Sequence, residues 1–137
     1  MPTSFIKVAI HFVWATWDRE PLIESEWEDR LYASIAAKCE ELNCPPYAIN
    51  GMADHMHVLL RLSGTLSLAQ IAQHLKGASS HLVNYEFKPS KLFRWQGAYW
   101  ASCVEVENID RVRRYIINQK LHHSQASLSH EWEYSNE

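Results

Sequence analysis

The spacing of apolar residues changes several times along the chain, and each change marks a border between a strand and a helix. Apolar side chains occupy every second position over residues 5–17, which predicts a β-strand with one buried face. Over residues 27–42 they recur every three or four positions, which predicts a helix. Ser25 with Glu28 is a capping-box signature, so we expect the helix to begin there.

The rest of the chain repeats this alternation. Residues 47–52 and 56–62 are typical of two short strands joined by a turn. Ser67 with Gln70 is a second capping box, and the apolar stripe after it predicts a second helix. Residues 99–106 are rich in aromatic and β-branched types, which favours a further strand.

A third helix is predicted near the end of the chain. Asn108 is a favourable N-cap residue, and the apolar positions after it predict a helix from Ile109 to about His122. The order of elements is then the split βαβ pattern with one terminal helix added. We therefore predict an α+β protein with a ferredoxin-like, RRM-like antiparallel sheet, helices on one face, and a C-terminal helix that bears Tyr115.

Length and cysteine content bound the class of protein. A chain of 137 residues is too short for two ordinary domains, so we expect a single domain over residues 1–123 and a polar tail over residues 124–137. No stretch predicts a membrane span or a secretion signal. The odd number of cysteines argues against a secreted disulfide framework, so we expect a cytoplasmic protein. The cysteines are Cys39, Cys44 and Cys103.

Charge is distributed unevenly along the chain. The formal net charge of -3 is unusual for a nucleic-acid-binding protein, because binding to phosphate favours a basic surface. Acidic side chains are concentrated in residues 18–41, however, and basic ones in the second half. One face of the protein could therefore be positive.

His55 and His57 are two residues apart at the start of a predicted strand. A strand projects alternate side chains to one face, so both imidazoles point the same way and Val58 points to the opposite face. If helices cover the Val58 side, the histidines lie on the bare face of the sheet. Two imidazoles can chelate a divalent ion, although a usable site needs at least one more ligand. Histidines with this spacing also occur as ordinary packing residues.

Tyr115 and Gln119 lie four residues apart beside the apolar stripe of the third helix. Their Cα atoms should be about 6 Å apart along the helix axis, so one side chain can bind a metal while the other reaches a phosphate. A tyrosine can act as a nucleophile if a cation, such as a metal or Arg111 or Arg114, favours the phenolate. The alternative is a half-buried tyrosine and a solvated glutamine without a chemical role.

Several segments of the chain form a recognisable set, namely HFVWATWDREPLI, DHMHVLL, LKGASSHLVN, WQGAYWASCV and VRRYIINQKLHH. In this order and spacing, from about Ile10 to His123, they resemble the small HUH-type single-tyrosine transposases of bacterial and archaeal insertion sequences. The NQ-x-x-HH ending resembles especially the relatives associated with repetitive extragenic palindromes.

The resemblance implies metal-assisted transesterification of single-stranded DNA that carries hairpins. By resemblance, a metal, Mg²⁺ or Mn²⁺, is bound by His55, His57 and Gln119. Tyr115 attacks the DNA, leaving a 5′-phosphotyrosine and a free 3′-hydroxyl. The resemblance also implies a homodimer in which the tyrosine helix of one subunit meets the histidines of the other, and residues 99–106 are the candidate interface.

Basic and aromatic residues of the second half are candidates for DNA contact. We expect basic side chains to contact the DNA backbone and aromatic rings to stack on unpaired bases. The basic candidates are Lys76, Arg94, Arg111 and Arg114, and the aromatic ones are Tyr99 and Trp95.

Two other functions remain open at this point. One is a non-catalytic single-stranded nucleic-acid-binding module, which would bind without metal or covalent adduct. The other is a metal-dependent hydrolase in which the two histidines serve a bound water and Tyr115 is dispensable.

Overall fold

Strand β1 (Ala9–Ala15) is buried along its whole length and lies inside a four-stranded sheet. The computed structural model describes residues 5–124 and 132–133. In these residues the strand order is β2-β3-β1-β4 and each neighbouring pair is antiparallel, which confirms the predicted ferredoxin-like sheet. The other strands and helices are α1 (Glu28–Glu41), β2 (Pro46–Met52), β3 (His55–Arg61), α2 (Leu68–Leu82), β4 (Trp100–Val104), α3 (Ile109–Ile117) and α4 (Gln119–Ser124).

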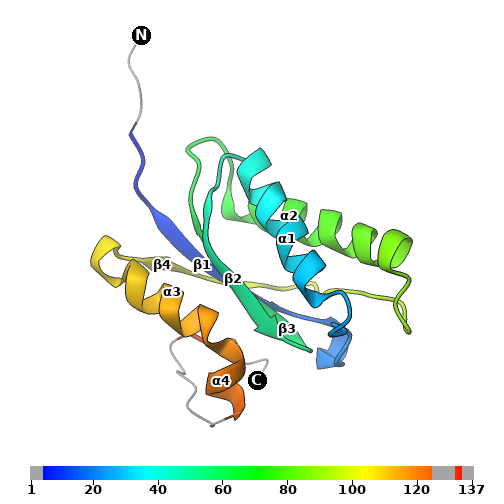
Figure 1. Cartoon of the computed structure of the whole chain (residues 1–137). Coiled ribbons are helices and arrows are strands. Elements are labelled where there is room, and N and C mark those ends of the chain that lie inside the picture. Colours follow the sequence, from blue (N-terminus) through cyan, green and yellow to red (C-terminus); the bar gives the residue numbers. More distant parts are fainter. Residues whose placement is uncertain (1–4, 125–131, 134–137) are drawn as a thin grey trace.

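Helices cover both faces of this sheet (Figure 1). On one face, the even-numbered residues of β1 and β3 pack with α1 and α2 to form the main core. On the other face, Leu59 packs with Val112 and Ile116 of α3. The Val58 face is therefore covered by helices, as expected, but the histidine face is not bare, because α3 and α4 contact its strands.

The two predicted capping boxes have different outcomes. Ser67 and Gln70 form both reciprocal hydrogen bonds at the start of α2, as predicted. Ser25 does not cap α1, which begins at Glu28 without a side-chain cap. The residues before α1 form a turn that directs Trp27 into the core, where its ring lies 5.9 Å from the ring of Phe93. Burial of this indole therefore sets the start of the helix.

The third helix is interrupted after two turns, contrary to the prediction of one helix to about His122. Asn118 has a φ of -94° and a ψ of 23°, and it separates α3 from α4. Its backbone N–H and its side-chain amide both donate to the carbonyl oxygen of Arg114, at 3.1 and 3.0 Å. Asn108 precedes α3 as predicted, but its side chain makes no capping hydrogen bond. Tyr115 and Gln119 consequently lie on two helical segments.

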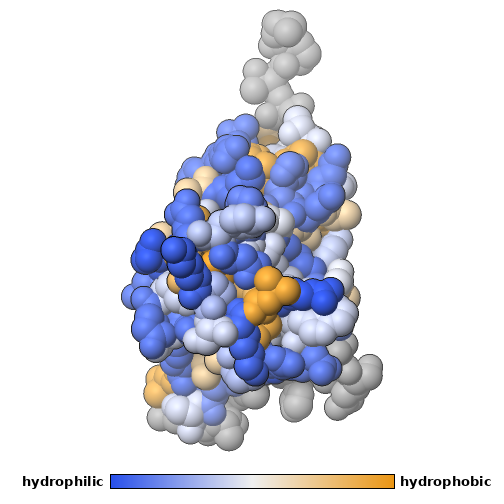
Figure 2. Space-filling view, turned by 90° about the vertical axis from the view of Figure 1, so that its right-hand side faces the viewer, coloured by the Kyte–Doolittle hydropathy of each residue, from blue (hydrophilic) through white to orange (hydrophobic). Residues whose placement is uncertain are grey.

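Much of the predicted polar tail lies outside the described residues, which include only Ser124, Trp132 and Glu133 of it. Trp132 packs against the cluster formed by α3 and the sheet. No described helix has the length and hydropathy that a bilayer span requires. Figure 2 shows a side of the molecule where hydrophilic residues surround a small apolar patch near the centre.

Two glycines offer a matched test of the hairpin that carries the histidines. A Cβ on Gly51 in β2 would lie 2.3 Å from the carbonyl oxygen of His55, whereas a Cβ on Gly77 in α2 would meet nothing within 4 Å. We predict that Gly51→Ala lowers the free energy of unfolding by about 1–3 kcal/mol through overpacking. Gly77→Ala should raise it by about 0.5–1 kcal/mol through helix propensity. Urea denaturation measures both, and a fully stable Gly51→Ala variant would contradict the close strand approach.

Candidate functional site

Both histidines of β3 point to the same face of the sheet, as the strand period predicts. His55 is the first residue of β3, and a two-residue turn joins it to β2. The backbone N–H of Thr16 donates to the carbonyl oxygen of Asp54 at 2.9 Å and holds this turn against the end of β1. The two imidazole rings lie 5.3 Å apart between centroids, and only 2% of His55 and none of His57 is exposed.

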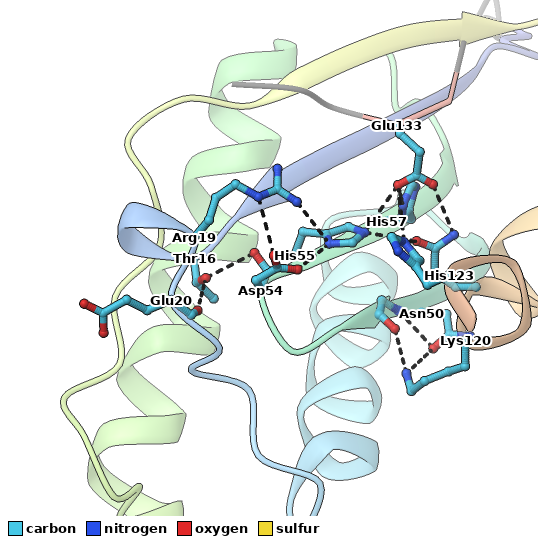
Figure 3. Close-up of polar contacts among 12 residues, drawn as sticks. Thr16, Arg19, Glu20, Asn50, Asp54, His55, His57, Lys120, His123 and Glu133 are labelled. Carbon is cyan, nitrogen blue, oxygen red and sulfur yellow. Dashed lines mark hydrogen bonds and ion pairs between the residues drawn. The ribbon is translucent and has the colours of Figure 1, made fainter. Parts of the chain in front are cut away.

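The Nδ1 atoms of the two histidines have different partners. His55 Nδ1 lies 2.8 Å from a carboxylate oxygen of Asp54, whose other oxygen lies 3.5 Å from Arg19 Nε (Figure 3). His57 Nδ1 lies 2.8 Å from Nε2 of His11 in β1. One ring is therefore held by an ion-paired carboxylate and the other by a second imidazole.

The Nε2 atoms of both histidines face a carboxylate from the C-terminal segment. Glu133 Oε1 lies 3.0 Å from His57 Nε2 and 3.3 Å from His55 Nε2. Gln119 Oε1 lies 3.0 Å from His55 Nε2, and the Gln119 amide donates to Glu133 Oε2 at 3.3 Å. His123 also turns its Nε2 toward this group, 2.8 Å from Gln119 Oε1. The predicted residues His55, His57 and Gln119 therefore come together. Glu133 and His123, which were not predicted, join them.

Sequence reasoning missed Glu133 because a single glutamate in a polar tail has no periodic signal. The only hint is its neighbour Trp132, an aromatic residue in a segment otherwise poor in apolar side chains. In the structure this indole lies 5.0 Å from the ring of Tyr115 and under the guanidinium of Arg111. Packing of Trp132 against α3 brings Glu133 to the histidines.

Tyr115 contacts the same carboxylate from α3. Its hydroxyl donates a hydrogen bond to Glu133 Oε2, and its ring lies 6.3 Å from the ring of His57 between centroids. The tyrosine ring stacks on His122 at 4.3 Å, and only 6% of the residue is exposed. The tyrosine oxygen and the two histidine Nε2 atoms of one chain thus meet at one carboxylate. The expected site shared between two subunits stays a prediction, because the structure contains a single chain.

Burial and hydrogen bonding oppose each other in setting the charges of this group. Burial lowers the pKa of His57, and the Glu133 carboxylate only partly offsets this effect. Burial would also lower the pKa of His55, but hydrogen bonds to Asp54, Glu133 and Gln119 outweigh it and raise that pKa to about 9. Burial of Glu133 is likewise outweighed by its hydrogen bonds to His55 and His57, so its pKa lies well below the usual range.

The donor set fits a divalent metal ion. His55, His57 and Glu133 each offer one ligand atom, and these atoms all lie within 4.8 Å of one another. The amide oxygen of Gln119 adjoins them. Imidazole nitrogens are general ligands of transition-metal ions, and carboxylate and amide oxygens suit Mg²⁺ and Mn²⁺. The residues present could therefore hold the expected cofactor.

The four predicted basic contacts do not gather at one place. Lys76 is half-buried and donates from Nζ to the carbonyl oxygen of Gln96 at 2.5 Å. Lys76 and Arg94 line an open hollow of about 490 Å³ between α2 and residues 93–99. Arg111 lies beside Trp132, and Arg114 pairs with Asp110 at 3.5 Å on the exposed side of α3.

The predicted stacking aromatics Trp95 and Tyr99 line the same hollow as Lys76 and Arg94, but they differ in exposure. Trp95 is buried and donates from its indole nitrogen to Ser79 at 2.9 Å, so it is not an exposed stacking surface. Tyr99 is partly buried against the core. Trp17 is 44% exposed instead, and the guanidinium of Arg94 lies 4.1 Å from the centre of a ring of its indole. Trp95 is not exposed because it packs in the core, where its ring lies 4.7 Å from the ring of Phe93.

The raised pKa of His55 has a consequence for stability. A pKa of about 9 in the folded state and 6.5 in the unfolded state means that the charged ring stabilises the fold fully below pH 6.5, and that this contribution disappears as the pH rises through 9. We predict that the stability advantage of the wild type over His55→Gln shrinks by about 3 kcal/mol at most between about pH 6 and about pH 9.5. Urea denaturation with a chelator measures this. If the difference in unfolding free energy between the wild type and His55→Gln did not vary with pH, the hydrogen bonds that raise the pKa of His55 would be contradicted.

Comparison with known proteins identifies a family and two similar folds. A family described as "Transposase IS200 like" matches residues 4–119. No protein among those with curated descriptions matches the chain. Two similar solved structures are a candidate transposase from Deinococcus radiodurans R1 and a REP-associated tyrosine transposase bound to a REP hairpin.

Both solved structures share the fold over most of their length. The Deinococcus protein is 22% identical with a TM-score of 0.65, and the match covers 87% of this chain and 95% of that one. The REP-associated protein is 15% identical with a TM-score of 0.66, and the match covers 98% of this chain and 79% of that one. Since the family match extends over most of the sequence, the chain belongs to the IS200-like transposase family.

Proposed function

We propose that this protein cleaves and rejoins single-stranded DNA through a covalent bond to Tyr115. The observation that carries the proposal is the meeting of the Tyr115 hydroxyl and the Nε2 atoms of His55 and His57 at one carboxylate. A nucleophile beside a metal-ligand set, in a family of transposases, supports strand transfer over simple binding.

The proposed step is a transesterification. The Tyr115 oxygen bonds to the phosphorus, the bond from phosphorus to the 3′ oxygen breaks, and the DNA is left with a 5′-phosphotyrosine and a 3′-hydroxyl. Glu133 accepts the hydrogen bond of the phenol through Oε2. It is therefore in position to take the phenolic proton, which ultimately replaces the broken bond at the 3′ oxygen. A second 3′-hydroxyl reverses the step without ATP.

We propose that His55, His57 and Gln119 bind Mg²⁺ or Mn²⁺, together with Glu133. A bound divalent ion supplies Lewis-acid stabilisation of charge on the scissile phosphate. Asp54 holds the His55 ring through Nδ1, and Glu133 presents Oε1 to both histidines while Oε2 faces the tyrosine. One carboxylate can in this way serve the metal and the nucleophile with separate oxygens.

We propose that DNA reaches this site along the basic residues identified above. The REP-associated relative is bound to a REP hairpin, and an unpaired strand beside a hairpin is the substrate class that we infer here. Arg94 lines the hollow beside α2 together with Tyr99, and its guanidinium lies over the exposed indole of Trp17. Lys76 lines this hollow, and Arg111 and Arg114 flank Tyr115 on α3.

A covalent adduct is the direct test of the nucleophile. With single-stranded hairpin DNA and Mg²⁺, we expect the wild type to form a DNA adduct that survives denaturation. Tyr115→Phe should abolish the adduct and retain hairpin binding, because only the attacking oxygen is lost. Tyr85→Phe is the matched control, since Tyr85 is 71% exposed. Cleavage by Tyr115→Phe without an adduct would favour a hydrolase, and binding without cleavage by the wild type would favour a non-catalytic module.

Measured metal affinity distinguishes variants of the proposed ligands from a variant of a residue that lies away from the site. Gln119→Ala and Glu133→Gln should each weaken Mn²⁺ binding by about tenfold or more, because losing a ligand should cost at least as much as losing an outer-shell partner. Glu40→Gln, on the exposed side of α1, is the control. Electron paramagnetic resonance of free Mn²⁺ gives the affinities. A cleavage reaction that chelators leave intact would remove metal from the proposal.

We also propose a homodimer that pairs through β4. This strand is at the edge of the described sheet and pairs there only with β1, so its outer backbone groups can accept another strand. Each subunit would retain the site that its own tyrosine helix forms.

Mixing two defective variants tests how the sites are assembled. After Tyr115→Phe and His57→Ala chains are refolded together, sites formed within single chains should all stay inactive, because every chain carries one defect. Sites shared between subunits would instead recover about a quarter of the wild-type number, since about half of the dimers are mixed. Adduct formation by demonstrated heterodimers distinguishes the two arrangements, and recovered adduct would contradict assembly within one chain.

We further propose a cytoplasmic location. Cys39, Cys44 and Cys103 are free thiols, and Cys103 is exposed. An exposed free thiol is typical of a reducing compartment.

A further inference from the structure

His11 is a fully buried histidine that the proposed chemistry does not use. It lies on β1, on the same face of the sheet as His57, and none of its surface is exposed. We propose that His11 is a positioning residue that orients His57 and leaves its Nε2 free to bind a metal. The proposal rests on the metal site of the proposed function.

The two rings are fixed against each other by several contacts. His11 Nε2 and His57 Nδ1 are 2.8 Å apart, and the ring planes differ by 24° at a centroid distance of 5.1 Å. The ring of Trp100 meets His11 edge-on at 5.3 Å from the neighbouring strand β4. His11 and His57 are therefore held by three adjacent strands rather than by a loop.

We infer the proton positions of the two rings from their hydrogen-bond partners. Without metal, His57 Nε2 is 3.0 Å from a carboxylate oxygen of Glu133, which can only accept, so the His57 proton is on Nε2. Its Nδ1 then accepts a hydrogen bond from Nε2 of a neutral His11. As a metal ligand, His57 Nε2 must carry no proton, so Nδ1 carries it and donates to His11 Nε2.

Both arrangements keep two neutral rings and one proton in the hydrogen bond between them. Going from the metal-free to the metal-bound arrangement removes a proton from His57 Nε2 and adds one to His11 Nδ1. The buried pair of rings therefore gains no net charge. A carboxylate or a lysine at position 11 could not both donate and accept in this way. An imidazole can do both through the same nitrogen.

The remaining nitrogen of His11 supports a role beyond packing. Its Nδ1 is buried and has no hydrogen-bond partner among residues 5–124 and 132–133. An unpaired buried polar atom destabilises a fold, so an apolar side chain would suit this place better if packing alone were required. The hydrogen bond to His57 is the interaction that an apolar residue could not make.

His55 provides the internal comparison. Its Nδ1 is bonded to the Asp54 carboxylate, which is the usual partner of a metal-binding histidine. The two proposed ligands are thus oriented by different groups, His55 by Asp54 in the β2–β3 turn and His57 by His11 in β1. Loss of His11 should affect the His57 ring and leave the hydrogen bond of His55 to Asp54 in place.

Two substitutions of His11 distinguish a role in positioning His57 from a role in packing alone. His11→Leu keeps an apolar volume and removes the acceptor, so Mn²⁺ binding should weaken by about 10–100-fold. His11→Gln can retain an acceptor near the position of Nε2, and it should bind Mn²⁺ within about threefold of the wild type. Thermal denaturation by circular dichroism verifies that both variants fold, and Mn²⁺ titration by electron paramagnetic resonance gives the affinities.

The tautomer of His57 gives a readout that does not depend on catalysis. In the wild type, nitrogen NMR should find the His57 proton on Nε2 without metal and on Nδ1 with saturating Mg²⁺. A His11→Leu variant that binds Mn²⁺ as the wild type does, or a His11→Gln variant that binds as weakly as His11→Leu, overturns the proposal. So does a wild type that binds no Mn²⁺. Normal metal binding without a DNA adduct would instead contradict only the proposed function.

Discussion

Two imidazoles buried side by side are the constraint on which the rest of this site depends. His55 and His57 lie on the face of β3 opposite the apolar core, and burial removes both from water. A buried polar ring costs free energy unless its nitrogens are hydrogen-bonded, so every nitrogen of the pair requires a partner. The partners come from β1, the β2–β3 turn, α4 and the C-terminal segment, and they are His11, Asp54, Gln119 and Glu133. The site thereby connects distant parts of the chain to the centre of the sheet.

The sequence predicted those parts of the fold that follow from local geometry. Period-two spacing predicted the strands and the common face of His55 and His57, because successive strand residues must alternate between faces. Helical spacing predicted the buried stripe of α3, including Val112 and Ile116. The resemblance of short segments also predicted the family, which the match over residues 4–119 confirms.

The parts that could not be predicted depend on contacts between distant residues. His11 shares the two-residue period of β1, but its nearness to His57 follows only from the antiparallel pairing of β1 with β3. Glu133 reaches the site because Trp132 packs beside α3. The start of α1 was misplaced for the same kind of reason, since burial of Trp27 outweighs a favourable capping sequence. Local spacing contains no information about such long-range packing.

Because the helix is interrupted at Asn118, Tyr115 and Gln119 belong to two helices that pack against different residues. Tyr115 belongs to α3, which packs on Leu59 of the sheet, whereas Gln119 opens α4 and is held by His55 and His123. On an unbroken helix, any displacement of Tyr115 would move Gln119 by a comparable amount. A single residue outside helical geometry can absorb a rotation between the two segments. Tyr115 could then move without displacing Gln119 from His55.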